Sequence, residues 1–138
     1  MTDLEAVKQD GYTLEFVKNQ TPKICLAAVK QNGRTLKYVK NQTKEICLLA
    51  VKQNGYALYY VKNQTEGICL AAVKQNDYAL QFVENQTPEI CLAAVEQDKN
   101  ALQFVSLDVI KKSFSLLVKP KIINNEENIS RFEIMDIE

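Results

Sequence analysis

KQNGYALYYVKNQTEGICLAAV, residues 52–73, decides the fold, because it is one of four copies of the same 22-residue unit. The copies follow one another without a gap from Lys8, Lys30, Lys52 and Lys74, and a degenerate fifth copy, EQDKNALQFV, starts at Glu96. A unit this short cannot bury its own apolar face, so such repeats stack into a solenoid. Positions that stay the same in each copy indicate architecture, and positions that change indicate a surface that can be specialised.

Each unit predicts two short helices. Thr21 is a suitable N-cap and Pro22 suits the first helical position, so the first helix begins there. We expect Gly33 to end it in the left-handed C-cap conformation that glycine adopts readily. A second, shorter helix is expected over residues 34–40, and it is too short to be stable in water without stacking. The predicted fold is all-α, an α-solenoid of tandem 22-residue helix-turn-helix repeats.

The two ends of the array depart from the repeat, as solenoid caps do. Asp3 and Glu5 stand where later repeats carry Cys and Ala, which gives the first helix a polar outer face. At the other end, SLDVIKKSFSLLVKP predicts a C-terminal capping helix over residues 106–119. We therefore expect a helical repeat domain over residues 1–120. A short extended tail should follow over 121–138, for which a strand packed on the solenoid is one option.

One cysteine stands in each complete repeat, at Cys25, Cys47, Cys69 and Cys91. Equivalent positions in stacked helices lie about 8–10 Å apart. A disulfide needs Cα atoms closer than about 7 Å, so these residues are not expected to pair. The spacing of 22 matches no zinc motif, and the chain has no histidine. We expect four reduced, buried and poorly reactive thiols.

The motif content argues against catalysis. The chain has no histidine, no tryptophan, no glycine-rich phosphate loop and no G-x-S-x-G. Its four equivalent cysteines lack the unique base partner that a nucleophile needs. We therefore expect a protein that is not an enzyme, with no catalytic residues, no cofactor, no metal and no small-molecule substrate.

The apolar residues, 46% of the chain, indicate a packed protein, but no apolar run reaches the ~18 residues that a membrane helix needs. The first residues lack the basic start and apolar stretch of a secretory signal. We expect a cytoplasmic protein with no membrane partner.

Charge is balanced overall but uneven along the chain. Residues 1–74 hold 11 basic and 6 acidic residues, and residues 75–138 hold 6 basic and 11 acidic residues. A drift of solvated surface charge is the favoured interpretation, and a partner with the opposite gradient is the sharper one.

Two lysine ladders could follow a nucleic-acid backbone, and they comprise Lys8, Lys30, Lys52 and Lys74, and Lys18, Lys40 and Lys62. The ladders turn acidic at Glu84 and Glu96, and the sequence pI is about 6.3. A general nucleic-acid binder is more basic than this. RNA binding is therefore the weaker alternative.

The best indication of recognition is variation between repeats. One variable position holds Glu15, Lys37, Tyr59, Gln81 and Gln103, and another holds Tyr12, Arg34, Tyr56, Tyr78 and Asn100. Both are expected on or beside the short helix, where they would form one stripe. Tyr and Arg are favoured interface anchors. The candidate partner-binding residues are Arg34, Lys37, Tyr56, Tyr59, Tyr78 and Gln81.

A neighbouring position is aromatic in every copy, and it holds Phe16, Tyr38, Tyr60, Phe82 and Phe104. Its constant size favours an inter-repeat core over a base-stacking platform. We therefore expect Tyr60 to matter for stability and Tyr59, which has no aromatic counterpart in other repeats, to matter for binding.

The string VKQNGYALYYVKNQTEGICLAAV resembles the tandem repeats of the domain of unknown function 4116 family. The resemblance spans about residues 4–105 and rests on the pattern AL-x-[FY]-V…T-x-E-I-C-L-x-AV. It implies a repeat protein of bacterial or viral type. It brings no catalytic residue and no ligand.

These observations favour a non-enzymatic helical repeat scaffold that binds a protein partner. An alternative is a small inhibitor of a bacterial defence nuclease, carried by a phage or mobile element and acting, like an anti-CRISPR protein, by stoichiometric binding. The paired caps and the charge polarity are compatible with both.

Overall fold

The computed structural model describes residues 1–122 and 130–134 of the chain. Contacts divide the chain into two compact units, Met1–Phe104 and Val105–Glu138. The first unit alternates α-helices with 3-10 helices. The α-helices are α1 (Asp3–Gln9), α2 (Pro22–Gln31), α3 (Lys44–Gln53), α4 (Glu66–Gln75) and α5 (Pro88–Gln97). The 3-10 helices are η1 (Gly11–Phe16), η2 (Gly33–Tyr38), η3 (Gly55–Tyr60), η4 (Asp77–Phe82) and η5 (Lys99–Phe104).

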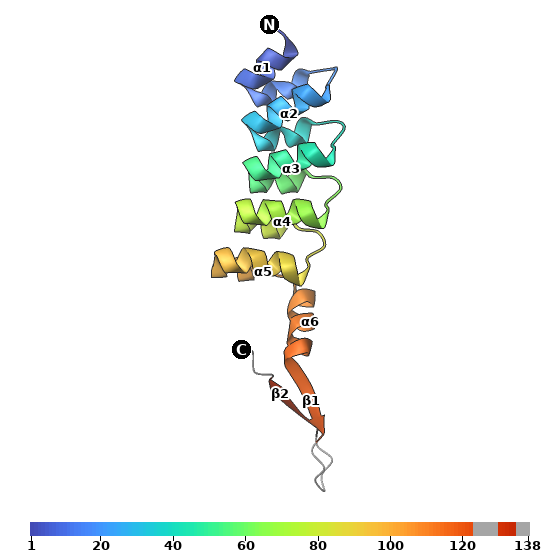
Figure 1. Ribbon diagram of the computed structural model, residues 1–138, viewed down its shortest axis with the longest axis vertical. Coiled ribbons are helices and arrows are strands. Elements are labelled where there is room, and N and C mark those ends of the chain that lie inside the picture. The colour runs from blue at the N-terminus through green and yellow to red at the C-terminus, as the bar shows by residue number, and fades with distance from the viewer. Residues whose placement is uncertain (123–129, 135–138) are drawn as a thin grey trace. The chain divides into compact units, whose positions relative to one another are not determined.

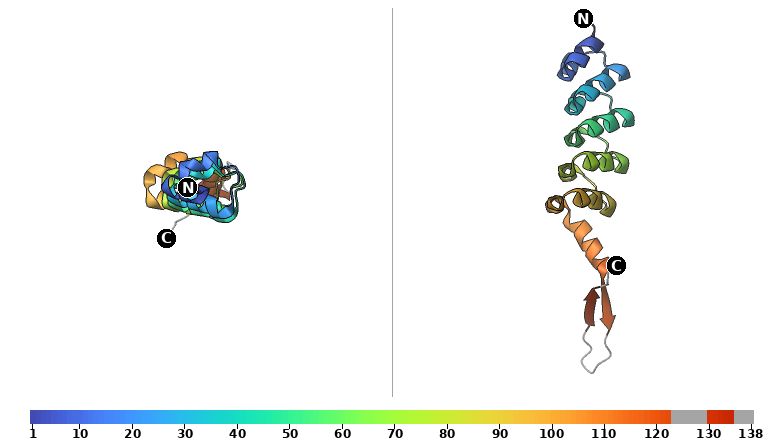
Figure 2. Two further views of the ribbon diagram at one scale, coloured as in Figure 1. Left: turned by 90° about the horizontal axis from the view of Figure 1, so that it is seen from above. Right: turned by 60° about the vertical axis from the view of Figure 1, so that its left-hand side comes forward.

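Within this first unit, the α-helices form one layer and the 3-10 helices form a second (Figure 1, Figure 2). Each α-helix packs on the α-helix of the next repeat, and each 3-10 helix packs on the next 3-10 helix. Contacts therefore run between sequential repeats, as in a solenoid. The prediction of an all-helical array of 22-residue repeats is confirmed.

The core of the array is built from the same few positions in each repeat. The 3-10 helices η1 to η4 each contribute one leucine, and the α-helices α2 to α5 each contribute an alanine and a cysteine. Fully buried leucines and alanines are Leu14, Leu36, Leu58 and Leu80, and Ala28, Ala50, Ala72 and Ala94. The small alanines let neighbouring helices approach closely. Among the described residues, no helix is long and apolar enough to span a bilayer.

The second helix of each repeat differs from the prediction, because it is a 3-10 helix that is over by Tyr38 rather than Lys40. Asn32 causes the tight start, since its side chain accepts a hydrogen bond from the Arg34 N–H at 3.0 Å. The Val39 N–H then donates to the Leu36 carbonyl at 3.0 Å, three residues back, while Val39 itself is extended. A 3-10 segment of 6 residues is long, since runs of more than about three or four residues are uncommon.

The expected left-handed glycine cap is wrong. The C-cap of α2 is Asn32 in an extended conformation, with φ −154°, and Gly33 starts the next helix. Only glycine fits at this position, because there is no room for a side chain. A Cβ on Gly33 would collide with the carbonyl oxygen of Ala50 in the following α-helix, α3. At Gly11 the equivalent Cβ would lie 2.7 Å from the Ala28 oxygen. The glycine therefore allows close backbone approach between repeats.

A ladder of half-buried glutamine side chains joins the repeats along the 3-10 layer. The Gln42 amide donates to the Tyr60 carbonyl at 2.8 Å, and its oxygen accepts from the Lys62 N–H at 3.0 Å. Gln20 and Gln64 bond the next repeat in the same way. Gln86 donates to the Phe104 carbonyl at 2.8 Å. We call these four residues the amide ladder.

A second set of glutamines stands at the end of the α-helices. The oxygen of Gln31 accepts from the Gly11 N–H at 2.9 Å, and Gln53 and Gln75 accept from Gly33 and Gly55. The fourth joint differs, because Asp77 replaces the glycine. There Gln97 donates instead to the Val73 carbonyl at 2.6 Å, and the buried Asp77 Oδ2 has no hydrogen-bond partner.

The second unit contains α6 (Leu107–Leu117), β1 (Val118–Ile122) and β2 (Ser130–Ile134). The two strands pair antiparallel, with Pro120 opposite Phe132. The helix predicted to cap the array therefore ends two residues before the predicted 119, and an extended segment begins before the predicted boundary at 120, while its capping role stays a prediction. Residues 123–129 and 135–138 of the predicted tail lie outside the described residues. The packing of the tail on the solenoid stays a prediction.

Replacing Gly33 by Ala should lower the free energy of unfolding by about 1–3 kcal/mol, because the new methyl group overlaps backbone atoms of the next repeat. Gly67→Ala is the matched control. Its Cβ would meet nothing within 4 Å, so it should leave stability unchanged or raise it by up to about 1 kcal/mol. Urea denaturation followed by circular dichroism measures both. Equal effects of the two substitutions would contradict the close-approach explanation.

Replacing Gln42 by Ala should cost about 1–3 kcal/mol, because the Tyr60 carbonyl and the Lys62 N–H lose their partner between two repeats. Gln81→Ala is the matched control, since Gln81 is exposed and bonds only within its own helix, to the Tyr78 carbonyl. It should change stability by no more than about 0.5 kcal/mol. A Gln42→Ala protein as stable as the control would remove the amide ladder from the account of stability.

Candidate functional site

The six candidate residues all lie in the 3-10 layer, two in each of three consecutive helices. Arg34 and Lys37 belong to η2, Tyr56 and Tyr59 to η3, and Tyr78 and Gln81 to η4. Each pair is separated by three residues, and side chains at i and i+3 of a 3-10 helix lie above one another. The predicted single stripe therefore follows from the 3-10 geometry, although the sequence reading assumed another kind of helix.

The candidate side chains are exposed to different degrees. Arg34, Lys37, Tyr59 and Gln81 are exposed, while Tyr56 and Tyr78 are half-buried. Tyr59 stands out, because 66% of its surface is accessible. The valines of the array are buried or half-buried, whereas Tyr59 is exposed on η3, the middle one of the three candidate helices, so we take it as the centre of the candidate surface.

The aromatic position predicted to form an inter-repeat core is not buried. Tyr38, Tyr60, Phe82 and Phe104 are half-buried, and Phe16 is 79% exposed. The prediction was wrong about burial, because the leucine two residues earlier, such as Leu58, fills the core and the ring stays half-buried. Tyr60 therefore contributes less to stability than a fully buried aromatic would.

These rings nevertheless make contacts between repeats, as expected. The ring of Tyr56 meets Phe82 edge-on with centroids 6.0 Å apart. Tyr78 meets Phe104 in the same way at 5.5 Å, and Tyr12 meets Tyr38 at 6.3 Å. In each case a ring at a variable position packs on the constant aromatic of the next repeat. Edge-to-face geometry of this kind is favourable for aromatic pairs.

Tyr59 joins two repeats from the outside. Its ring lies 5.1 Å from that of Tyr60 and 5.3 Å from that of Phe82, both edge-on. Tyr56 also contacts Phe82, so three aromatic side chains of η3 and one of η4 form a continuous cluster. The cluster holds Tyr59 in place while leaving most of its ring accessible.

Two cations lie over tyrosine rings of the 3-10 layer. The Arg34 guanidinium carbon is 5.9 Å from the Tyr56 ring centre. The Lys37 ammonium is 4.8 Å from the Tyr38 ring and 5.8 Å from the Tyr12 ring. The pKa of Lys37 is raised above its ordinary value, chiefly by its hydrogen bond with Tyr38 and further by its electrostatic interaction with the tyrosines. Each cation is therefore oriented on an aromatic face.

We call these residues together the aromatic surface: Arg34, Lys37, Tyr38, Tyr56, Tyr59, Tyr60, Tyr78, Gln81 and Phe82. The helices η2 and η3 and the loops that follow them, residues 33–43 and 55–65, contain no Asp or Glu. Lys40 and Lys62 are exposed in the same segments. The surface thus combines clustered rings with net positive charge, which suits an acidic partner surface. Lys37 lies over the rings of Tyr38 and Tyr12.

Sequence reasoning missed Tyr38 and Phe82 as surface residues. Their constant size in every repeat pointed to the core, and a constant residue can equally support a variable neighbour. The three-residue spacing of the candidate pairs puts both members on one face of an α-helix and of a 3-10 helix alike, so it gave no signal for the 3-10 form.

The cysteines are free and buried, which confirms that part of the prediction. Each thiol lies near the amide oxygen of a glutamine five residues earlier, as Cys91 does with Gln86 at 3.4 Å. Burial raises the pKa of all four thiols, and the pKa of Cys69 rises to about 11. A thiolate nucleophile is therefore disfavoured at neutral pH. Among the described residues, no cluster of His, Cys, Asp and Glu could hold a metal ion.

Comparison with known proteins assigns this repeat to a family. The family described as "Domain of unknown function (DUF4116)" matches four overlapping segments, residues 4–43, 21–66, 43–87 and 65–111. Each segment covers about two repeats. No curated protein and no solved structure matches the chain.

At pH 8 the native protein should react slowly with a thiol reagent such as 5,5′-dithiobis(2-nitrobenzoic acid). With a pKa of about 11, only about one Cys69 thiol in a thousand is ionised at that pH. Because the pKa of Cys69 is raised, lowering the pH removes the remaining thiolate and slows the reaction with the reagent. Raising the pH toward 11 increases the thiolate fraction and the reaction rate. Denaturation should release all four thiols. A native thiol that reacts as fast as free cysteine would contradict this.

Proposed function

The chain belongs to the DUF4116 family, a domain of unknown function, and we propose that it is a non-enzymatic helical scaffold that binds a protein partner through its aromatic surface. The observation that supports this proposal is the ring cluster of η3 and η4, in which Tyr59 is 66% exposed yet held by Tyr60 and Phe82. Rigid, exposed tyrosines lose little conformational entropy on binding and are enriched among the residues that dominate interface energies.

The charge of the surface favours a partner with an acidic face. Arg34 and Lys37 each lie over a tyrosine ring, so they are partly ordered before binding. Positive charge near an aromatic centre accelerates encounter with an acidic surface and selects against basic ones. We also propose that the protein is of bacterial or viral type and is located in the cytoplasm.

Variation between repeats supports recognition over a purely structural role. Lys37, Tyr59 and Gln81 occupy equivalent positions, and all three are exposed. A surface with identical repeats would offer a partner the same contacts at each repeat, whereas this surface offers a different side chain at each repeat. Tyr59 lies in η3, the middle one of the three candidate helices, where a partner that spans several repeats would be centred.

Tyr59→Ala should abolish capture of the partner while leaving the fold intact. The test is affinity capture from lysate of the source organism with mass spectrometry, comparing the native chain, Tyr59→Ala and Leu92→Ala. Leu92 is 58% exposed and lies in the α-layer, so it controls for the loss of an exposed apolar side chain. Removing a central tyrosine from an interface typically costs about 2 kcal/mol or more, roughly thirtyfold in affinity.

The captured molecule separates the alternatives. A nuclease that is blocked in a stoichiometric complex would make the chain an inhibitor acting through the same surface. Capture of RNA that falls steeply with salt would replace the protein-binding proposal. Retention of the partner by Tyr59→Ala, at native affinity, would show that the aromatic surface is not the interface.

A further inference from the structure

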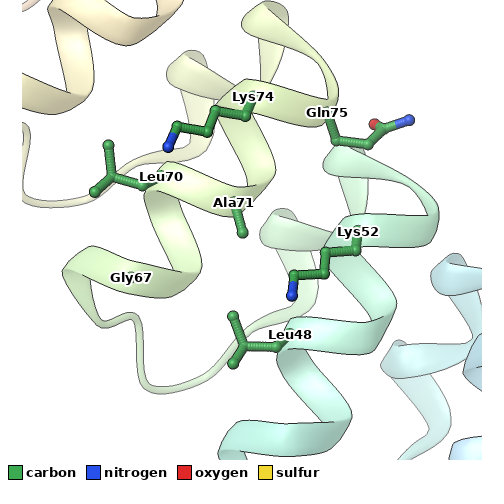
Figure 3. Close-up of a pocket in the computed structure, with 7 residues that line it drawn as sticks. All are labelled: Leu48, Lys52, Gly67, Leu70, Ala71, Lys74 and Gln75. Atoms are coloured by element: carbon green, nitrogen blue, oxygen red, sulfur yellow. The ribbon is translucent and has the colours of Figure 1, made fainter.

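A groove lies in the other layer of the array, between α3 and α4 (Figure 3). Its volume is about 580 Å³, and it is lined by Leu48, Lys52, Gly67, Leu70, Ala71, Lys74 and Gln75. The leucines and Ala71 are half-buried, and both lysines are exposed. None of these residues belongs to the 3-10 helices that form the aromatic surface.

Gly67 widens the groove, and packing within the chain does not require it. A Cβ on Gly67 would meet nothing within 4 Å, whereas Gly11, Gly33 and Gly55 each contact the next repeat. Equivalent positions in the other repeats carry Lys23, Glu45 and Glu89. Glycine also lowers helix stability relative to other residues, by up to about 1 kcal/mol. The space above Gly67 is thus left open at a cost to the fold.

The groove is apolar along its floor and positive at one end. Leu48 and Lys52 are one turn apart on α3, and Leu70 and Lys74 are one turn apart on α4, so each leucine lies beside a lysine (Figure 3). No carboxylate is among the lining residues. The acidic residues of these two helices, Glu45 and Glu66, stand in the first turns, while the lysines stand in the last turns.

The spacing of these Leu–Lys pairs matches an α-helix laid across them. Neighbouring packed helices are about 8–10 Å apart. Seven residues of an α-helix rise about 10.5 Å, so such a helix presents the same face at each repeat of the array. A heptad with one acidic and one or two apolar residues would therefore place a carboxylate near each lysine and an apolar side chain on each leucine.

We propose that the groove between α3 and α4 docks an acidic amphipathic helix of a partner protein. The apolar side chains of that helix rest on Leu48 and Leu70, its backbone approaches over Gly67, and its carboxylates pair with Lys52 and Lys74. The lining contains no aromatic ring on which a nucleobase could stack, which favours a peptide over single-stranded RNA. This site is separate from the aromatic surface and does not depend on the function proposed above.

The test uses a synthetic 21-residue alanine-based helix, labelled with fluorescein, that carries Glu at every seventh position and a Leu four residues from each Glu, on the same face of the helix. A counterpart with Lys in place of Glu is the matched peptide. Fluorescence anisotropy with the full chain should show binding of the Glu peptide and none of the Lys peptide. Amide shifts in a ¹⁵N–¹H spectrum should be largest at Gly67, Leu70 and Lys74.

Gly67→Glu is the decisive variant, because it restores the residue that α3 and α5 carry at this position. It should weaken binding of the Glu peptide at least tenfold, by filling the groove and repelling the carboxylates. Its melting temperature should equal or exceed that of the native chain, since Glu is favourable in the first turn of a helix. Lys52→Glu with Lys74→Glu should weaken binding by a similar factor.

Tyr59→Ala should leave binding of the Glu peptide unchanged, which separates this site from the aromatic surface. Failure of the Glu peptide to bind, or equal binding by Gly67→Glu, would overturn the proposal. Displacement of the bound peptide by a single-stranded RNA, lost in the same lysine variants, would overturn it in favour of a nucleic-acid site.

Discussion

The amide ladder is the constraint on which the array depends. Each of its glutamines bonds backbone groups of the following repeat, as Gln42 does with the Tyr60 carbonyl and the Lys62 N–H. The 3-10 helix ends in extended residues, so its last polar groups have no partner within their own helix. A side-chain amide supplies a donor and an acceptor at once. The repeats are thereby fixed at one spacing, and the apolar core and the outer rings both inherit it.

The sequence predicted the architecture because the strongest signals were local and repeated. Thr21 caps α2 by accepting from the Ile24 N–H, and the 22-residue period appears as sequential packing. The glycine explanation failed because close approach between two repeats is a property of packing, which sequence patterns do not show. Gly33 looks the same in the sequence whether it supplies a left-handed cap or a gap for the Ala50 carbonyl.

The sequence predicted which helices carry the candidate residues, but it did not predict how deeply the neighbouring aromatic residues are buried. The six candidate residues were found by comparing repeats, and all of them lie in the 3-10 helices η2, η3 and η4, while their role in binding stays a prediction. The burial of its neighbours was misjudged, since constant size at Tyr60 and Phe82 was taken as evidence for the core. The groove between α3 and α4 was not predicted, because the absence of a side chain at Gly67 carries meaning only when its surroundings are known.

The fourth joint has a mechanical consequence. Asp77 replaces the glycine that elsewhere donates to the next repeat, Gln97 turns to the Val73 carbonyl, and the Asp77 Oδ2 is buried without a partner. An unpaired buried oxygen stores free energy that separation of the two repeats would release to water. We therefore expect the joint between η4 and α5 to separate at a lower force, and to open more often by thermal motion, than the regular joints. The helices that line the groove, α3 and α4, end in Gln53 and Gln75 and keep the regular joint, whereas η4, which contributes Phe82 to the ring cluster, begins at the irregular one.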